Sequence, residues 1–169
     1  SAVAILPFSK ALNFLVFFFS GSITSAIIPQ NNSYLKRFPP VIIMKITFLG
    51  TSSMLPTHDR NHSSIFLEYN QEGILIDCGE GTQKQLRIAK IKPNKISKIL
   101  ITHFHGDHVL GIPGIIQNLA AHDYQDTLEI FGPRGTKSNI KKLLSGIIFQ
   151  GKIKTKITEL SSGVFCKNS

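Results

Sequence analysis

The sequence predicts an α/β domain that is built in layers. Short β-branched or aromatic runs, bounded by glycine, proline or asparagine, are typical of strands, and segments with helical apolar spacing lie between them. This alternation favours a sheet covered by helices. We expect strands at residues 45–50, 64–69, 73–77, 97–102 and 127–131.

A hairpin and a capped helix are predicted in the first half of this domain. Gln71, Glu72 and Gly73 are expected to turn the second strand into the third. Thr82 is expected to cap a helix that runs to about Lys90, and Pro93 keeps the residues that follow out of a helix.

Two further helices are predicted around the last strand. One follows Gly111, carries Pro113 in its first turn and ends near His122. The other starts after Thr136 and places four apolar side chains on its buried face, namely Ile140, Leu143, Leu144 and Ile147.

The composition fits one domain with a basic surface. The chain has 169 residues, and its apolar content of 42% is sufficient for a core. The formal net charge is +9, and residues 44–169 contain 16 basic and 10 acidic residues. A basic domain favours a polyanionic partner. Cys78 and Cys166 lack the spacing of a disulfide framework or a metal motif, which suits a reducing cytosol.

Residues 1–43 differ from the rest, because they contain no acidic residue and include an apolar run at residues 11–19. A secretory signal or an organellar transit peptide would each explain part of this pattern. We expect instead a leader or translated upstream segment outside the fold, with the protein starting at Met44, the first methionine. A transmembrane span is not expected, because small and polar residues at 20–24 interrupt the apolar run.

Residues 103–108 read His-Phe-His-Gly-Asp-His and directly follow an apolar run at 96–102. The carboxyl end of a strand is where α/β sheets tend to hold their chemistry. His103 and His105 are spaced to point the same way and hold one metal ion, while Asp107 and His108 turn toward a second. These ligand types suit zinc, manganese or iron. The alternative is a polar surface loop that is rich in histidine by chance.

The motif His-x-His-x-Asp-His after a hydrophobic strand resembles that of the metallo-β-lactamase superfamily. The surrounding sequence resembles the amino-terminal half of the ribonuclease Z family, from Met44 nearly to the end of the chain. This resemblance rests on residues 44–51, Pro56, and residues 60–64, 76–83, 91–96, 111–114 and 131–135.

The resemblance implies a four-layer αβ/βα sandwich, of which this chain holds only the amino-terminal half. It also implies a zinc-dependent endoribonuclease that removes the 3′ trailer from precursor tRNA and leaves a 3′-hydroxyl. The family site holds two zinc ions, with manganese as an alternative. The complete protein is expected to be a cytoplasmic homodimer, or an organellar one if residues 1–43 are a transit peptide, with no membrane partner.

The resemblance also implies roles for single residues. His103 and His105 would hold the first metal, and Asp107 and His108 the second, while Asp107 would also act as the catalytic proton acceptor. Asp77, at the end of an apolar strand, would hold the ligand loop in place. The alternative for Asp77 is an Asx-turn at the strand end.

Two sets of residues are candidates for RNA contact. Arg60 and Asn61 match the family's loop near the site. Six basic residues lie between Gly81 and Gly106 with no acidic residue among them, and they would guide an RNA backbone toward the metals: Lys84, Arg87, Lys90, Lys92, Lys95 and Lys98. The alternative for these six is a solvated helix face and loop.

Several nearby residues have a plainer interpretation. Gly79, Gly81 and Thr82 either present backbone amides to a phosphate or only let the chain turn. Three other histidines are expected to be polar surface residues and not ligands, namely His58, His62 and His122.

The resembled family completes its site with a histidine, an aspartate and a last histidine that would lie beyond Ser169. We therefore expect a truncated chain that is inactive alone. One rival interpretation is another metallo-β-lactamase-fold hydrolase, such as a thioesterase or phosphodiesterase, and the other is a non-catalytic half-domain. The loop at Arg60 and Asn61 and the segment 77–83 argue against the first rival.

Overall fold

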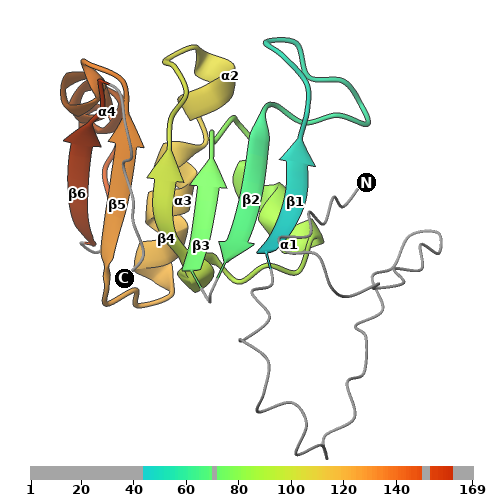
Figure 1. Cartoon of the computed structure of the whole chain (residues 1–169), viewed down its shortest axis with the longest axis horizontal. Helices are drawn as coiled ribbons and strands as arrows, with labels where there is room; N and C mark the ends of the chain where they lie inside the picture. Colours follow the sequence, from blue (N-terminus) through green and yellow to red (C-terminus); the bar gives the residue numbers. More distant parts are fainter. Residues whose placement is uncertain (1–43, 70–71, 150–152, 162–169) are drawn as a thin grey trace, which may run out of the picture.

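The structure is a computed structural model that describes residues 44–69, 72–149 and 153–161 (Figure 1). The expectations for residues 1–43, for Gln71 and for Cys166 lie outside the described residues.

A six-stranded sheet, in which the strand order follows the sequence, organises the described chain. Strands β1 (Met44–Gly50), β2 (Ser64–Tyr69) and β3 (Glu72–Ile76) pair antiparallel. Strands β4 (Ile96–Leu100), β5 (Thr127–Gly132) and β6 (Lys154–Glu159) continue the sheet parallel to β3. The carboxyl ends of β3 to β6 therefore meet at one edge, the upper edge in Figure 1.

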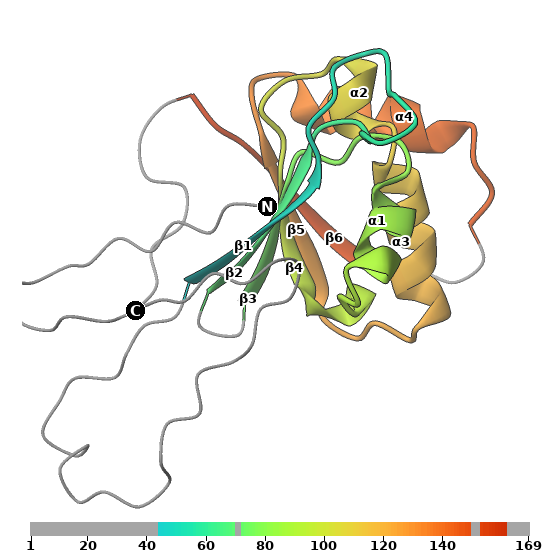
Figure 2. The same ribbon diagram turned by 90° about the vertical axis from the view of Figure 1, so that its right-hand side faces the viewer.

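Helices cover one face of this sheet. Helices α1 (Thr82–Ile88), α3 (Ile112–Ala121) and α4 (Thr136–Ser145) lie on the same side (Figure 2). The short helix α2 (Gly106–Val109) lies at the edge where the parallel strands end, and the 3₁₀ helix η2 (Pro93–Lys95) leads into β4.

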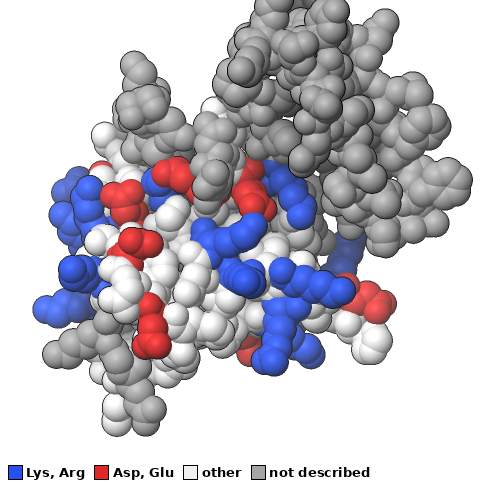
Figure 3. Space-filling view, turned by 90° about the horizontal axis from the view of Figure 1, so that it is seen from below, with Lys and Arg blue, Asp and Glu red and all other residues white. Residues whose placement is uncertain are grey.

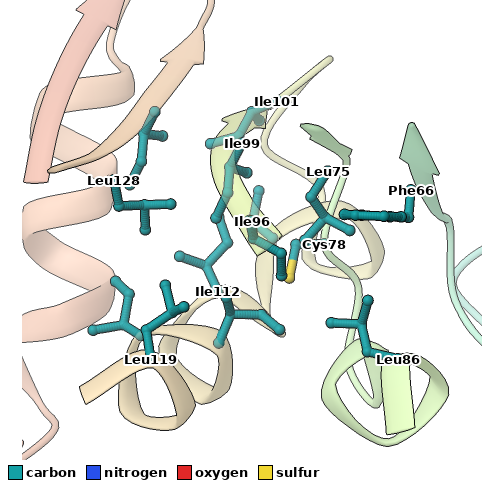
Figure 4. Packing of buried hydrophobic residues seen from close by; sticks show 14 of the residues in the cluster. Phe66, Leu75, Cys78, Leu86, Ile96, Ile99, Ile101, Ile112, Leu119 and Leu128 are labelled. Carbon is teal, nitrogen blue, oxygen red and sulfur yellow. The ribbon is translucent and has the colours of Figure 1, made fainter. Parts of the chain in front are cut away.

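The core lies between the sheet and these helices. Alternate strand residues face the helices, because side chains along a strand point to opposite sides. The cluster includes, among others, Phe66, Leu75, Ile99 and Leu128 from the strands and Leu86, Ile112 and Leu119 from the helices (Figure 4).

The opposite face of the sheet carries a row of apolar side chains across four strands. The register pairs Phe48 with Ile65, Ile65 with Ile76, and Ile76 with Leu100. Among the described residues, no helix lies over this row, and Phe48 is 49% exposed.

The predicted α/β class is confirmed, and the five predicted strands and three predicted helices are present with ends shifted by at most two residues. Glu72 and Gly73 were expected in a turn, but both are paired with β2. Gly73 is needed there because a Cβ would lie 2.1 Å from the Lys95 carbonyl oxygen. Strand β6 and helix α2 were not predicted.

Two local predictions were wrong. Thr82 does not cap α1, because its hydroxyl donates to the Gly79 carbonyl (2.7 Å), and Gly81 takes the N-cap position with a φ of 78° that suits glycine. Helix α4 ends at Ser145, so Ile147 follows the helix and does not belong to its buried face.

Candidate metal centre

The four predicted metal ligands lie on the loop and short helix that follow β4, at the edge where the parallel strands end (Figure 1). Strand β3 is the neighbour of β4, so Asp77, the first residue after β3, lies beside the start of this loop. The Asp77 N–H donates to the Leu100 carbonyl oxygen at 2.8 Å, which fixes the two strand ends together.

Asp77 holds the ligand loop through its buried carboxylate. Its Oδ1 accepts the backbone N–H of Thr102 (2.8 Å), and its Oδ2 accepts the Thr102 hydroxyl (2.8 Å) and the Nδ1–H of His108 (2.7 Å). The Asp77 backbone has a φ of 55°, which costs a non-glycine residue about 1 kcal/mol or more. This geometry favours the loop-holding interpretation over an Asx-turn.

His108 is held so that its second ring nitrogen faces Asp107. Because a carboxylate only accepts, Nδ1 carries a hydrogen toward Asp77, and in the neutral ring this leaves a lone pair on Nε2. This Nε2 lies 3.3 Å from Asp107 Oδ2. Either a hydrogen on Nε2 or a metal ion would satisfy the two facing atoms, and imidazole and carboxylate are donor types that bind metal ions.

Asp107 supports the same conclusion. The residue is buried, and its Oδ1 has no hydrogen-bond partner within the described part of the chain. A buried carboxylate oxygen without a partner is costly unless a cation satisfies it. The pair Asp107 and His108 therefore fits a metal ion.

His103 and His105 lie beside this pair. The ring centroids of His103 and His105 are 4.7 Å apart, and those of His103 and His108 are 4.0 Å apart. The fold thus brings all four predicted ligands together. Within the described ranges, however, no group of three or more histidine, cysteine or acidic side chains is arranged to hold one metal ion.

Backbone packing behind the loop explains two of the glycines near it. Cys78 N–H donates to the His108 carbonyl (2.7 Å), and Gly111 N–H donates to the Cys78 carbonyl (2.9 Å). A Cβ on Gly79 would lie 2.3 Å from the Asp107 carbonyl oxygen. A Cβ on Gly111 would lie 2.1 Å from the Gly79 carbonyl oxygen. The segment after β3 therefore forms a close-fitting base for the ligand loop.

Cys78 is an apolar member of this base and not a ligand. The residue is fully buried, and burial raises the pKa of its thiol well above the usual range. A hydrogen bond with Thr82 opposes this rise in pKa, and the charge of Asp77 adds to it.

Two of the three candidate amides before and at the start of α1 already have acceptors, which favours the turn interpretation. Gly79 N–H donates to the Ser63 carbonyl (3.1 Å), and Thr82 N–H donates to the Gly79 carbonyl (3.2 Å). Asn61 supports the same turn, because its side-chain amide donates to the Glu80 carbonyl at 2.7 Å. Arg60, in contrast, is exposed.

The six basic residues between Gly81 and Gly106 do not all adjoin the ligand loop as expected. Lys84 and Arg87 lie on α1, whereas Lys90, Lys92 and Lys95 approach the start of β4, about 15 Å from its other end. Figure 3 views the molecule from that far end, where basic and acidic side chains lie next to one another.

Two of these lysines have acidic partners. Lys95 pairs with Glu68, and Lys98, only 7% exposed, pairs with Glu72 at 2.8 Å. The other four of the six basic residues are exposed, namely Lys84, Arg87, Lys90 and Lys92.

The other histidines have partners of their own. His58 contacts Asp59, and His122 Nδ1 donates to the Asn118 carbonyl (2.8 Å); both are exposed as expected. His62 was expected at the surface but is buried, and its Nδ1 donates to the Ser53 carbonyl (2.9 Å). Thr102 is the functional candidate that the sequence did not reveal. Its only signal was a polar residue at the end of an apolar run, directly before the first histidine.

A mixed sheet with helices on one face and a His-x-His-x-Asp-His loop at its edge defines a protein of the metallo-β-lactamase fold. A metallo-β-lactamase-fold protein from Bacillus subtilis superposes with a TM-score of 0.57 at 22% identity, covering 70% of this chain and 45% of its own. The short form of human tRNase Z superposes with a TM-score of 0.62 at 35% identity, covering 69% of this chain and 44% of its own.

Residues 44–164 match the model of the family described as anti-Pycsar protein Apyc1, and the chain belongs to this family. It is also similar to ribonuclease Z of Methanothermobacter thermautotrophicus, with 53% identity over 93 residues, which are 55% of this chain and 30% of the relative. The chain spans about a third of the length of the curated ribonuclease Z relatives that it matches. In the described residues, no helix has the length and apolar character needed to cross a membrane.

Proposed function

We propose that the protein is a metal-dependent endoribonuclease of the ribonuclease Z type, which removes the 3′ trailer from precursor tRNA and leaves a 3′-hydroxyl. The arrangement of Asp77, His108 and Asp107 carries this proposal, because Asp77 engages one ring nitrogen of His108 and the other, Nε2, lies 3.3 Å from the buried Asp107 carboxylate, whose Oδ1 has no hydrogen-bond partner among the described residues. The identity of 44–53% to curated proteins named ribonuclease Z supports it.

The ligand roles follow the two pairs on the loop. His103 and His105 would hold one metal ion, and Asp107 and His108 a second. Bound metals would make a water more acidic and offset the charge on the phosphate. Asp107 accepts the proton of the attacking water, and Asp77 keeps His108 oriented by accepting its Nδ1–H.

Three imidazoles and one carboxylate suit zinc, with manganese as an alternative. We propose precursor tRNA as the partner, a homodimer as the complete form, the cytoplasm as the location and a fold that begins at Met44, where the family match also begins.

A chimera tests the proposed activity. The 93-residue matched segment of the Methanothermobacter relative is replaced by the corresponding segment of this chain, and cleavage of a precursor tRNA with a 3′ trailer is measured. We expect metal-dependent cleavage at the 3′ end. Asp107→Ala should abolish cleavage but keep most of the binding at the first metal, whereas His103→Ala should lower metal content. Equal cleavage by the parent chimera and either variant would refute the ligand assignment.

A second candidate is a metallo-β-lactamase-fold phosphodiesterase that acts on small molecules. The chain matches the family described as anti-Pycsar protein Apyc1 as well as the ribonuclease Z relatives, and metal-activated water can hydrolyse other phosphodiesters. Competition between a small phosphodiester and precursor tRNA in the same chimera distinguishes the two. Faster turnover of the small diester, with no specific tRNA product, would favour the second candidate.

A further inference from the structure

The hydroxyl of Thr102 lies between the Asp77 carboxylate and the His103 ring. Its Oγ1 is 2.8 Å from Asp77 Oδ2, 3.0 Å from Asp77 Oδ1 and 3.0 Å from His103 Nδ1. A hydroxyl has one hydrogen to donate, and an ionised carboxylate can only accept. The Thr102 hydrogen therefore points to Asp77, and the Thr102 oxygen accepts the hydrogen on His103 Nδ1.

We propose that Thr102 is a positioning residue that fixes the ring hydrogen of His103 on Nδ1 and so presents Nε2 to a metal ion. A histidine ligand binds through a nitrogen without hydrogen, and the partner of the other nitrogen decides which one that is. The consequence for metal binding rests on the proposed function, because it requires His103 to be a ligand.

Asp77 then sets the tautomers of two histidines by separate routes. It accepts the Nδ1–H of His108 directly at 2.7 Å, and it controls His103 through the Thr102 hydroxyl. The His103 and His108 rings are 4.0 Å apart and belong to different expected ligand pairs. One carboxylate would thus align a ligand for each metal.

Loss of the hydroxyl breaks only one of these routes. Thr102→Val keeps the shape of the side chain but has no hydroxyl, whereas Thr102→Ser keeps the hydroxyl and serves as the matched control. Thr102 is exposed, so neither change opens a cavity in the core. Asp77 still accepts the backbone N–H of residue 102 and the Nδ1–H of His108, so His108 is an internal control.

The tautomers are measured by NMR of the 169-residue chain with ¹⁵N-labelled histidine, without metal. The pH is set about two units above the usual histidine pKa of about 6.5, and the ¹⁵N shifts themselves report whether each ring is neutral. His103→Gln identifies the His103 signals. We expect the Nδ1–H form in the parent chain and Thr102→Ser, and a mixture of forms in Thr102→Val, with His108 unchanged in all three. An identical His103 tautomer in the parent and Thr102→Val would overturn the proposal.

A zinc competition titration of the same chains measures the consequence. Thr102→Val should bind zinc about tenfold more weakly than the parent, because loss of a group that orients a metal-bound histidine lowers metal affinity by about tenfold or more. Thr102→Ser should bind zinc as tightly as the parent. A tautomer shift without a change in zinc affinity would show that the hydroxyl does not serve metal binding, and the proposal would fail. If the parent chain alone binds no zinc, the titration is made in the chimera, where Thr102→Val should show the same loss and Thr102→Ser none. Absence of zinc binding in the chimera would refute the proposed metal site and leave the tautomer assignment standing, whereas equal affinity of the parent and Thr102→Val there would overturn the proposal.

Discussion

Asp77 is an example of one residue whose contacts outweigh its backbone strain. The left-handed φ of 55° costs about 1–3 kcal/mol. Each hydrogen bond to a charged group contributes about 1.5–3 kcal/mol, and the carboxylate accepts from the Thr102 N–H, the Thr102 hydroxyl and the His108 ring. The balance favours the native position, so the contacts hold the strained residue in place.

Two replacements of Asp77 should therefore separate the effect of backbone strain on stability from the effect of the carboxylate's hydrogen bonds. Asp77→Ala keeps the strain and removes the acceptor, so the free energy of unfolding in urea should fall by at least about 2 kcal/mol. Asp77→Gly should lose less, because glycine adopts this φ without cost. The exposed Asp126→Ala is the control and should change stability by less than about 0.5 kcal/mol. Equal losses for the alanine and glycine variants would show that strain is unimportant here.

Cys78 should make stability depend on pH. Burial raises the pKa of its thiol in the folded state, whereas the unfolded thiol ionises at about pH 8.5. Above that pH, the unfolded state loses a proton that the folded state keeps, so the free energy of unfolding should fall as pH rises, by about 1.4 kcal/mol per pH unit from this group.

Urea unfolding across this alkaline range measures the effect of Cys78. Cys78→Ala lacks the thiol, so its stability should fall less steeply with pH, and contributions from other groups cancel in the comparison. Parallel pH profiles for the two chains would contradict the expected role of burial.

At the scale of elements, the sequence predicted the strands and helices that have a local apolar pattern. It did not predict an element that depends on pairing with a distant strand. Strand β6 reads Lys-Thr-Lys-Ile-Thr-Glu, which contains β-branched residues but only one apolar one, so no apolar pattern marks it, yet all six residues pair with β5. Helix α2 has only four residues, too few for an apolar period.

In the candidate site, too, some residues could be predicted from local spacing and others could not. Its four ligands were visible as a local spacing, whereas the role of Thr102 depends on the pairing of β3 with β4. That pairing brings Thr102 to Asp77, 25 positions earlier in the chain.

The close fit between the segment after β3 and the start of α3 gives a prediction with a matched control. Gly111→Ala would place a Cβ 2.1 Å from the Gly79 carbonyl oxygen, so backbone must move. We expect a loss of about 1–3 kcal/mol in urea unfolding. Gly146→Ala has nothing within 4 Å of the added Cβ and should change stability by less than about 0.5 kcal/mol. Similar stabilities for the two variants would refute the close fit.

The exposed basic residues of α1 and the loop after it define the expected electrostatic contact with tRNA. In the chimera, Lys84→Gln with Arg87→Gln and Lys92→Gln should weaken tRNA binding and lower the slope of log affinity against log salt by about one unit per lost phosphate contact. Lys95→Gln is the control, because Lys95 already pairs with Glu68. An unchanged slope in the triple variant would assign these residues to a solvated face.

At the scale of the molecule, the uncovered apolar row is the main feature that the described residues leave without a partner. Phe48, Ile65, Ile76 and Leu100 follow one another across four paired strands. Contiguous apolar surface of this kind marks an interaction site or an aggregation risk. The metal centre is also incomplete in the described residues, since no group of three ligands forms there. A single partner that covers the row and brings further ligands would meet both needs.

The apolar row needs a cover, and the metal centre needs further ligands. Zinc sites normally use three or four protein ligands, so residues 44–169 alone should not cleave precursor tRNA at any zinc or manganese concentration, and they should self-associate in sedimentation. Addition of the part of the Methanothermobacter relative that this chain does not match, as a separate polypeptide, should lower self-association and restore cleavage. Ile65→Lys should reduce both self-association and rescue, because it places a charge within the row. Metal-dependent cleavage by the isolated monomer would mean that further side chains of this chain complete the metal centre.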